Sequence, residues 1–203
     1  MINNDVIRGI DGFGCLDEGD EDAPCLRRRG FLKVAALAVA GLTVSPAFAR
    51  TMTTKERYVS LFNPKTGEGL RLVYWAPSDG YLRQSIKEIS WALRDYHNDR
   101  VKAFDPTLMD VLYALQVQLN VREPVHVISG YRSPATNAML RRRSKRVAKN
   151  SLHMAAKAVD IRVPGRSVAD VRRAAWSLQA GGVGYYPRSG FVHVDTGEIR
   201  RWG

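Results

Sequence analysis

Two short segments near the end of the chain place polar residues at alternate positions between apolar ones. In AVDIR (residues 158–162), a valine and an isoleucine flank Asp160, and in FVHVDT (residues 191–196), two valines alternate with His193 and Asp195. Because successive side chains of a β-strand point to opposite faces, each segment has one apolar and one polar face. If the two strands pair with their polar faces aligned, Asp160 and His193 meet. This alternation predicts a sheet with a buried apolar face and a functional polar face.

A second histidine, His153, lies seven residues before Asp160. This separation suits neither one helix face nor one strand face, but it suits a loop that folds back toward the start of the strand. Two imidazoles and one carboxylate, with a fourth position open to water, are the ligands that a catalytic zinc ion requires. The alternative is that the histidines are hydrogen-bonded core residues and the aspartate forms a turn. The spacing alone leaves both interpretations open.

The rest of the chain after residue 50 alternates strand-like and helix-like patterns. Asp105 followed by Pro106 is typical of a helix start, and Ser167 can cap another helix. The order of the elements predicts a single α+β domain with a central antiparallel sheet and flanking helices. The predicted strands cover 58–62, 70–75, 125–129, 158–163, 183–186 and 191–196, and the predicted helices cover 82–96, 106–119, 135–147 with Met139 and Leu140 inward, and 168–179.

The first 49 residues have the order of an export signal. Arg28 and Arg29 precede Gly-Phe-Leu-Lys, an apolar run at 34–44 and Ala-Phe-Ala at 47–49. The run is too short to span a bilayer and ends in an A-x-A-like cleavage site. We therefore expect a twin-arginine signal peptide with a long disordered start over 1–49, a folded domain over 50–203, export by the twin-arginine machinery to the periplasm, and no stable membrane span after cleavage. The alternatives are a basic patch before a short buried helix, and a single-span anchor.

Charge and cysteine positions restrict the partners and the metal ligands. Residues 1–49 hold 5 of the 31 basic and 7 of the 20 acidic residues, so the formal charge rises from +11 for the chain to +13 for residues 50–203. Outside the cytoplasm, such a surface meets anionic wall polymer or lipid rather than nucleic acid, although a generally solvated basic surface is an alternative. Cys15 and Cys25 precede the predicted cleavage, so histidine and carboxylate must hold any metal in the mature domain.

Four stretches together resemble a known family. They are SGYRS (129–133), SLHMAAKAVD (151–160), GGVGYYP (181–187) and FVHVDTG (191–197). They are similar to stretches of the murein endopeptidase K family, which belongs with the D-alanyl-D-alanine carboxypeptidases, lysostaphin-type enzymes and the hedgehog signalling domain. The similarity extends over nearly all of the predicted mature domain. It implies a hedgehog-like or D-Ala-D-Ala-peptidase-like fold.

The resemblance also implies an activity and a site. Zn2+ would be held by His153, Asp160 and His193, and the enzyme would hydrolyse stem-peptide cross-links of peptidoglycan, in this branch between two diaminopimelate residues. Arg132 would correspond to the arginine that orients or polarises the substrate, because a guanidinium forks onto a carboxylate or a carbonyl. We therefore expect a periplasmic zinc metallopeptidase, a murein endopeptidase, acting in cell-wall turnover.

Two departures from the family pattern concern the site. Ala156 stands where glycine is usual, which costs about 1 kcal/mol if its φ is positive and nothing if it is negative. No glutamate or histidine precedes His193 at the position of the general base in related enzymes. Asp195 is the nearest candidate catalytic carboxylate, and the favoured alternative is that it orients a ligand imidazole. His126 is a weak candidate for the same cleft, and His97 is expected at the surface.

Two other functions stay open. One is a carboxypeptidase that removes a terminal D-alanine. The other is a wall-binding protein that keeps zinc without turnover, an alternative that the missing base keeps open. A nucleic-acid role is suggested by charge alone and is not expected.

Overall fold

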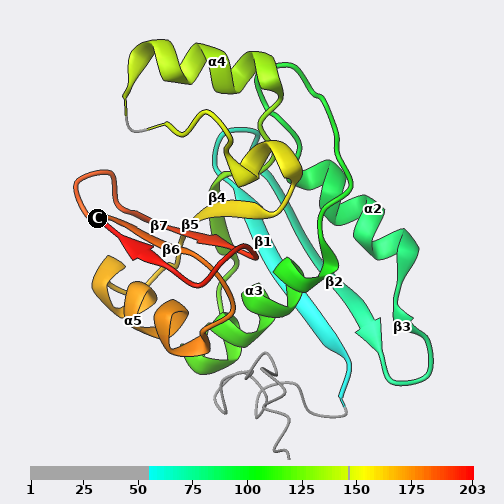
Figure 1. Cartoon of the computed structure of the whole chain (residues 1–203). Helices are drawn as coiled ribbons and strands as arrows, with labels where there is room; N and C mark the ends of the chain where they lie inside the picture. The colour runs from blue at the N-terminus through cyan, green and yellow to red at the C-terminus, as the bar shows by residue number, and fades with distance from the viewer. Residues whose placement is uncertain (1–54, 146) are drawn as a thin grey trace, which may run out of the picture. The chain divides into compact units, whose positions relative to one another are not determined.

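The computed structural model describes residues 55–145 and 147–203. The predicted signal peptide, its cleavage site and both cysteines lie outside these residues. The described part contains one eight-stranded sheet in the order β3-β2-β1-β4-β5-β7-β6-β8 (Figure 1). Its strands are β1 (Arg57–Asn63), β2 (Glu68–Ala76), β3 (Gly80–Tyr81), β4 (Val125–Ser129), β5 (Ala158–Arg162), β6 (Val183–Tyr186), β7 (Phe191–Asp195) and β8 (Arg201–Trp202).

Most neighbouring strands in the sheet are antiparallel, as the sequence predicted. Two pairs, β1 with β4 and β6 with β8, are parallel. The fold is therefore α+β with a mostly antiparallel sheet, which confirms the predicted fold class. The helices are α2 (Arg83–Ala92), α3 (Pro106–Gln118), α4 (Pro134–Arg143), the 3-10 helix η1 (Leu152–Ala155) and α5 (Val168–Leu178).

The apolar face of the sheet packs against helices. Helix α3 contacts α5 and β1, and α5 also contacts β6 and β7. The alternating residues of β5 and β7 enter this core: Val159, Ile161, Val192 and Val194 are at most 1% exposed. Burial of each such side chain contributes about 1.5–3 kcal/mol. The register of β5 and β7 is therefore strongly held, because a slip by one residue would turn these side chains to the other face.

Helix starts follow the predicted capping chemistry. The Asp105 side chain accepts a hydrogen bond from the Thr107 backbone N–H at 3.0 Å, and Pro106 occupies the first turn of α3. Ser167 accepts from the Asp170 backbone N–H at the start of α5. These caps satisfy backbone donors that have no partner within the helix.

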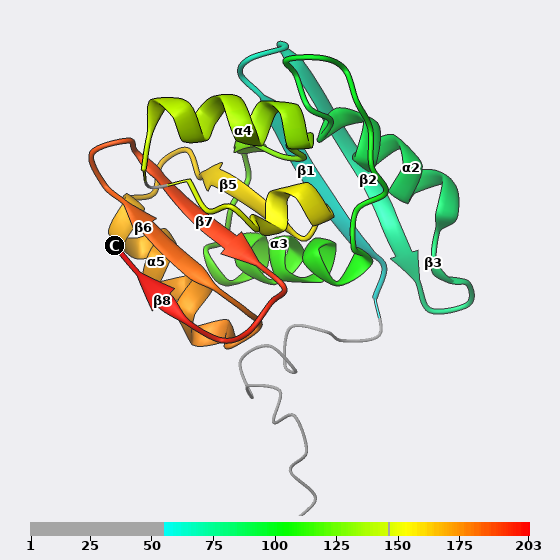
Figure 2. The same cartoon turned by 45° about the horizontal axis from the view of Figure 1, so that its top comes forward.

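Helix α4 differs from the prediction in its end and in its inward face. It ends at Arg143, four residues earlier than predicted. Thr136 and Asn137 are buried, whereas Met139 and Leu140 are only half-buried. Asn137 is turned inward because its side-chain amide donates hydrogen bonds to backbone carbonyls of the loop that follows α4. This contact ties the loop, which crosses the polar face of the sheet, to the helix (Figure 2).

Among the helices of the described residues, none has the length and apolar character needed to cross a bilayer.

Candidate metal centre and cleft

The sheet register brings two of the three predicted ligands together. Asp160 on β5 is the direct cross-strand partner of His193 on β7. His153 enters from η1, the turn that precedes β5, so the predicted fold-back is a short 3-10 helix. The three residues offer ligand atoms that all lie within 4.8 Å of one another, and all three side chains are buried.

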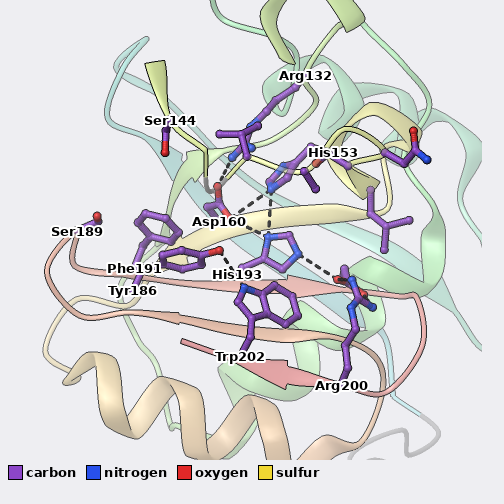
Figure 3. A pocket seen from close by; sticks show the side chains of 16 residues that line it. Arg132, Ser144, His153, Asp160, Tyr186, Ser189, Phe191, His193, Arg200 and Trp202 are labelled. Carbon is purple, nitrogen blue, oxygen red and sulfur yellow. Dashed lines mark hydrogen bonds and ion pairs between the residues drawn. The ribbon is translucent and has the colours of Figure 1, made fainter. Parts of the chain in front are cut away.

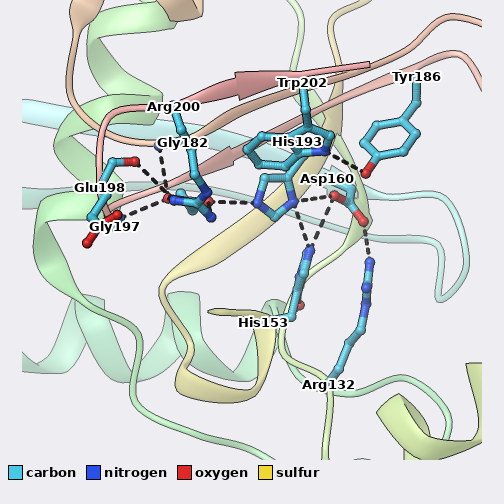
Figure 4. Close-up of polar contacts among 12 residues, drawn as sticks. Arg132, His153, Asp160, Gly182, Tyr186, His193, Gly197, Glu198, Arg200 and Trp202 are labelled. Atoms are coloured by element: carbon cyan, nitrogen blue, oxygen red, sulfur yellow. Dashed lines mark hydrogen bonds and ion pairs between the residues drawn. The ribbon is translucent and has the colours of Figure 1, made fainter. Parts of the chain in front are cut away.

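The three ligand atoms converge on one point (Figure 4). His193 Nδ1 lies 2.9 Å from Asp160 Oδ1 and 3.2 Å from His153 Nε2, and His153 Nε2 lies 3.3 Å from Asp160 Oδ1. These distances would be repulsive if all three atoms carried only lone pairs. A cation at this point removes that conflict.

The outer nitrogen of each imidazole has its own acceptor. His153 Nδ1 lies 2.7 Å from the carbonyl oxygen of Gly130, and His193 Nε2 lies 3.0 Å from Asp195 Oδ2. If each outer nitrogen carries the proton and donates it, the inner nitrogens of both rings are left with lone pairs. In metal sites, a hydrogen bond from the outer ring nitrogen holds the histidine in the tautomer that can bind the metal. The residues present therefore fit a divalent metal ion.

Electrostatics at the centre also favours a cation. Burial raises the pKa of Asp160, but contacts with His153, His193 and Arg132 outweigh it and hold that pKa well below its ordinary value. Burial lowers the pKa of His153, so this ring is neutral at pH 7. For His193, burial is outweighed by Asp160 and Asp195, which raise its pKa. The carboxylates on either side of His193 attract a proton in the same way that they would attract a metal ion.

Asp195 is enclosed behind His193 rather than facing the ligand atoms. Its Oδ1 accepts from the backbone N–H groups of Gly182 and Gly197, both at 2.9 Å. Its Oδ2 contacts His193 and the Arg200 guanidinium, the latter at 2.9 Å. Burial raises the pKa of Asp195, but these hydrogen bonds outweigh it and lower the pKa overall. A carboxylate with both oxygens occupied supports the orienting role over base catalysis.

Arg132 contacts the remaining oxygen of Asp160. Its guanidinium donates to Asp160 Oδ2 and, through Nε, to Ser129 Oγ at 2.8 Å. Asp160 therefore presents Oδ1 to the histidines and Oδ2 to Arg132. Arg132 therefore lies beside the three candidate ligands and is paired with one of them, Asp160.

The loop that carries Arg132 is held by residues that sequence reasoning missed. The Tyr131 backbone N–H donates to the Leu93 carbonyl at 2.8 Å, and the Ser133 N–H donates to Asp95 Oδ2 at 2.8 Å. A Cβ at Gly130 would lie 2.3 Å from the Leu93 oxygen, so only glycine fits there. Leu93 and Asp95 are distant in sequence, and no local pattern marks them.

Ala156 ends η1 in the left-handed conformation, with φ of 54°. This resolves the sequence-based alternative: the backbone there is the kind that favours glycine, and alanine costs about 1 kcal/mol. The turn still forms, since the Ala156 N–H donates to the His153 carbonyl. The turn that carries His153 therefore forms with alanine at this position.

A cleft of about 440 Å³ opens over the cluster (Figure 3). One side comes from the loop after α4 and the other from the ends of β6, β7 and β8. Neither His126, which packs against Phe62, nor the exposed His97 lines it. The lining residues are Arg132, Ser144, Val147, Ala148, Asn150, Ser151, Leu152, His153, Asp160, Tyr186, Ser189, Phe191, His193, Asp195, Arg200 and Trp202.

The fold and the His-Asp-His cluster define a class: an α+β domain with a candidate metal centre on the polar face of its sheet. Comparison with known proteins identifies the family. Residues 51–202 match the family model described as peptidoglycan L,D-endopeptidase MepK. The chain is 43% identical over 176 residues to the peptidoglycan L,D-endopeptidase MepK of Escherichia coli strain K12, covering 86% of this chain and 96% of that one.

A second relative agrees. The probable peptidoglycan L,D-endopeptidase MepK of Haemophilus influenzae is 39% identical over 178 residues, covering 86% of this chain and 95% of that one. The chain therefore belongs to the peptidoglycan L,D-endopeptidase MepK family, as the resemblance had indicated.

Proposed function

We propose that this protein is a zinc-dependent murein endopeptidase that hydrolyses L,D cross-links between peptidoglycan stem peptides. Endopeptidase activity on peptidoglycan follows from family membership. The single observation that supports the metal-dependent mechanism is the convergence of His153 Nε2, His193 Nδ1 and Asp160 Oδ1 on one point beneath an open cleft.

The chain's own residues have distinct parts in this proposal. His153, Asp160 and His193 hold the ion, Asp195 holds the His193 ring in its ligating tautomer, and Arg132 holds Asp160. When bound, Zn2+ would supply a Lewis acid that polarises the scissile carbonyl and lowers the pKa of a water molecule toward ~7. The cleft above the ligands then has to orient the peptide and stabilise the charge that develops on its carbonyl oxygen.

We extend the proposal to the location of the protein. Residues 1–49 act as a twin-arginine signal, and residues 50–203 work in the periplasm on stem peptides. The +13 formal charge of residues 50–203 suits an anionic wall substrate. Replacing Arg28 and Arg29 with lysine should retain a tagged protein in the cytoplasmic fraction. Unchanged recovery in the periplasmic fraction would refute the twin-arginine route.

Muropeptide chromatography tests the activity. Purified sacculi are incubated with the full chain and Zn2+, beside a chelated sample and the His193→Ala variant. The matched control is His97→Ala, because His97 is exposed and lies outside the cleft. We expect loss of cross-linked dimers with the wild type and His97→Ala only. Shortening of monomers instead would indicate a carboxypeptidase, and retention on sacculi without any product would indicate a binding protein.

A further inference from the structure

Tyr186 lines the cleft and has no part in the proposed mechanism so far. On β6 it is the cross-strand partner of Phe191, and its ring stacks on that phenyl ring at 4.6 Å between centroids. It lies on the same face of the sheet as His193, because Gly184, two residues earlier on β6, pairs directly with His193. The stick view shows its hydroxyl group directed toward the ligand cluster (Figure 3).

Trp202 fixes the position of this hydroxyl. Its indole N–H donates to the Tyr186 oxygen at 2.9 Å. The indole reaches that far because Gly184 has no side chain: a Cβ there would lie 2.7 Å from the Trp202 ring. The same ring packs against His193, with centroids 5.2 Å apart (Figure 4). One aromatic side chain from β8 thus touches both a metal ligand and the tyrosine hydroxyl.

The direction of this hydrogen bond leaves the Tyr186 proton available. A phenol oxygen that accepts from an N–H still has its own O–H to donate. Within residues 55–145 and 147–203, the structure gives this O–H no acceptor. The two guanidinium groups that line the cleft are already engaged, Arg132 by Asp160 and Ser129 and Arg200 by Asp195.

Resting on the proposed function, we infer that Tyr186 is a catalytic residue: its hydroxyl donates a hydrogen bond to the oxygen of the scissile amide as negative charge develops there. Trp202 is a positioning residue that acts through that hydroxyl. A fixed donor aimed at this oxygen stabilises the transition state more than the ground state, so its removal lowers kcat and leaves KM almost unchanged.

The test is a double-mutant cycle of Tyr186→Phe and Trp202→Phe in the full chain, assayed on purified L,D-cross-linked muropeptide dimers. Tyr186→Phe keeps the stacked ring and is expected to lower kcat about 100-fold, with KM within twofold. Trp202→Phe is expected to lower kcat about tenfold alone and to have no further effect in the Tyr186→Phe background. Tyr185→Phe, from the neighbouring residue outside the cleft, is the matched control and should match the wild type.

Zn2+ affinity, measured by competition with a chelating dye, provides a readout independent of turnover. All four variants are expected to bind Zn2+ within threefold of the wild type, since no ligand is changed. A Tyr186→Phe enzyme with kcat within threefold of the wild type, or with the loss confined to KM, would overturn the catalytic role. A further loss from Trp202→Phe in the Tyr186→Phe background would overturn the positioning role. A wild type inactive on every dimer would instead overturn the proposed function itself.

Discussion

Replacing Asp195 with asparagine should place the proton of His193 on the wrong nitrogen. The Asp195 Oδ1 position faces two backbone N–H groups, from Gly182 and Gly197, so the amide oxygen must stay there. The amide NH2 group then faces His193 Nε2, where the carboxylate oxygen now lies at 3.0 Å. Because NH2 only donates, Nε2 must become an acceptor, and the ring proton moves to Nδ1. Nδ1 is the atom directed at Asp160 and cannot then bind a metal.

The expected magnitude follows from this rearrangement. To bind a metal through Nδ1, His193 must either turn, which breaks its contact with Asp160, or keep its proton on Nε2, where it would face the NH2 group of the new asparagine. Loss of such an outer partner lowers metal affinity about 10- to 100-fold, which corresponds to about 1.4–2.8 kcal/mol. Arg200 adds little to this figure, since its side chain is 45% exposed and can move to solvent.

The assay is competition of Asp195→Asn with a chelating dye for Zn2+, with unfolding followed in parallel to show that the variant is folded. The matched control is Asp79→Asn, which removes an exposed carboxylate far from the ligands in sequence. We expect the control to retain wild-type affinity. If folded Asp195→Asn binds Zn2+ within threefold of the wild type, the argument from the His193 tautomer is refuted.

Three further perturbations test the support of the site. Gly130→Ala should lower the free energy of unfolding by about 1–3 kcal/mol in urea titrations, because its Cβ would meet the Leu93 carbonyl oxygen at 2.3 Å; an unchanged midpoint would contradict this. Arg132→Lys should weaken Zn2+ binding about tenfold, because lysine cannot hydrogen-bond to Asp160 and Ser129 at the same time. Equal affinity would show that one of these contacts suffices. Burial raises the pKa of Asp95, but hydrogen bonds outweigh burial and lower this pKa overall. The ionised Asp95 therefore stabilises the fold above its unfolded pKa of about 3.9, and this contribution is lost as the pH falls through the folded pKa. Asp95→Asn should therefore destabilise the fold by about 1–3 kcal/mol at pH 7 and by less below pH 3, and a difference that does not shrink on acidification would refute this.

Much of the architecture could be predicted from local patterns. The strands β5 and β7 followed from period-two alternation, and α3 and α5 from their capping residues, because these signals depend on neighbours within a few positions. The end and inward face of α4 could not be predicted in this way. They depend on the Asn137 amide binding a loop that returns from further along the chain.

For the site, the sequence by itself indicated the candidate donor set. Strand alternation directs Asp160 and His193 toward one face, the spacing suggested that a loop brings His153 back to them, and the resemblance to the family assigned all three to zinc. Local sequence can specify the two strand residues because the strand period alone decides which face a side chain occupies.

Only the tertiary structure decided how those donors are held and what surrounds them. Three contacts depend on strand register and on loops far apart in sequence. They are Asp195 with His193, Arg132 with Asp160, and Trp202 with Tyr186. The parallel pairing of β8 with β6 is the clearest case, since two residues at 201–202 carry no periodic signal of their own. The Trp202 ring fits beside His193 because Gly184 has no side chain, and these residues come together only once the sheet has formed.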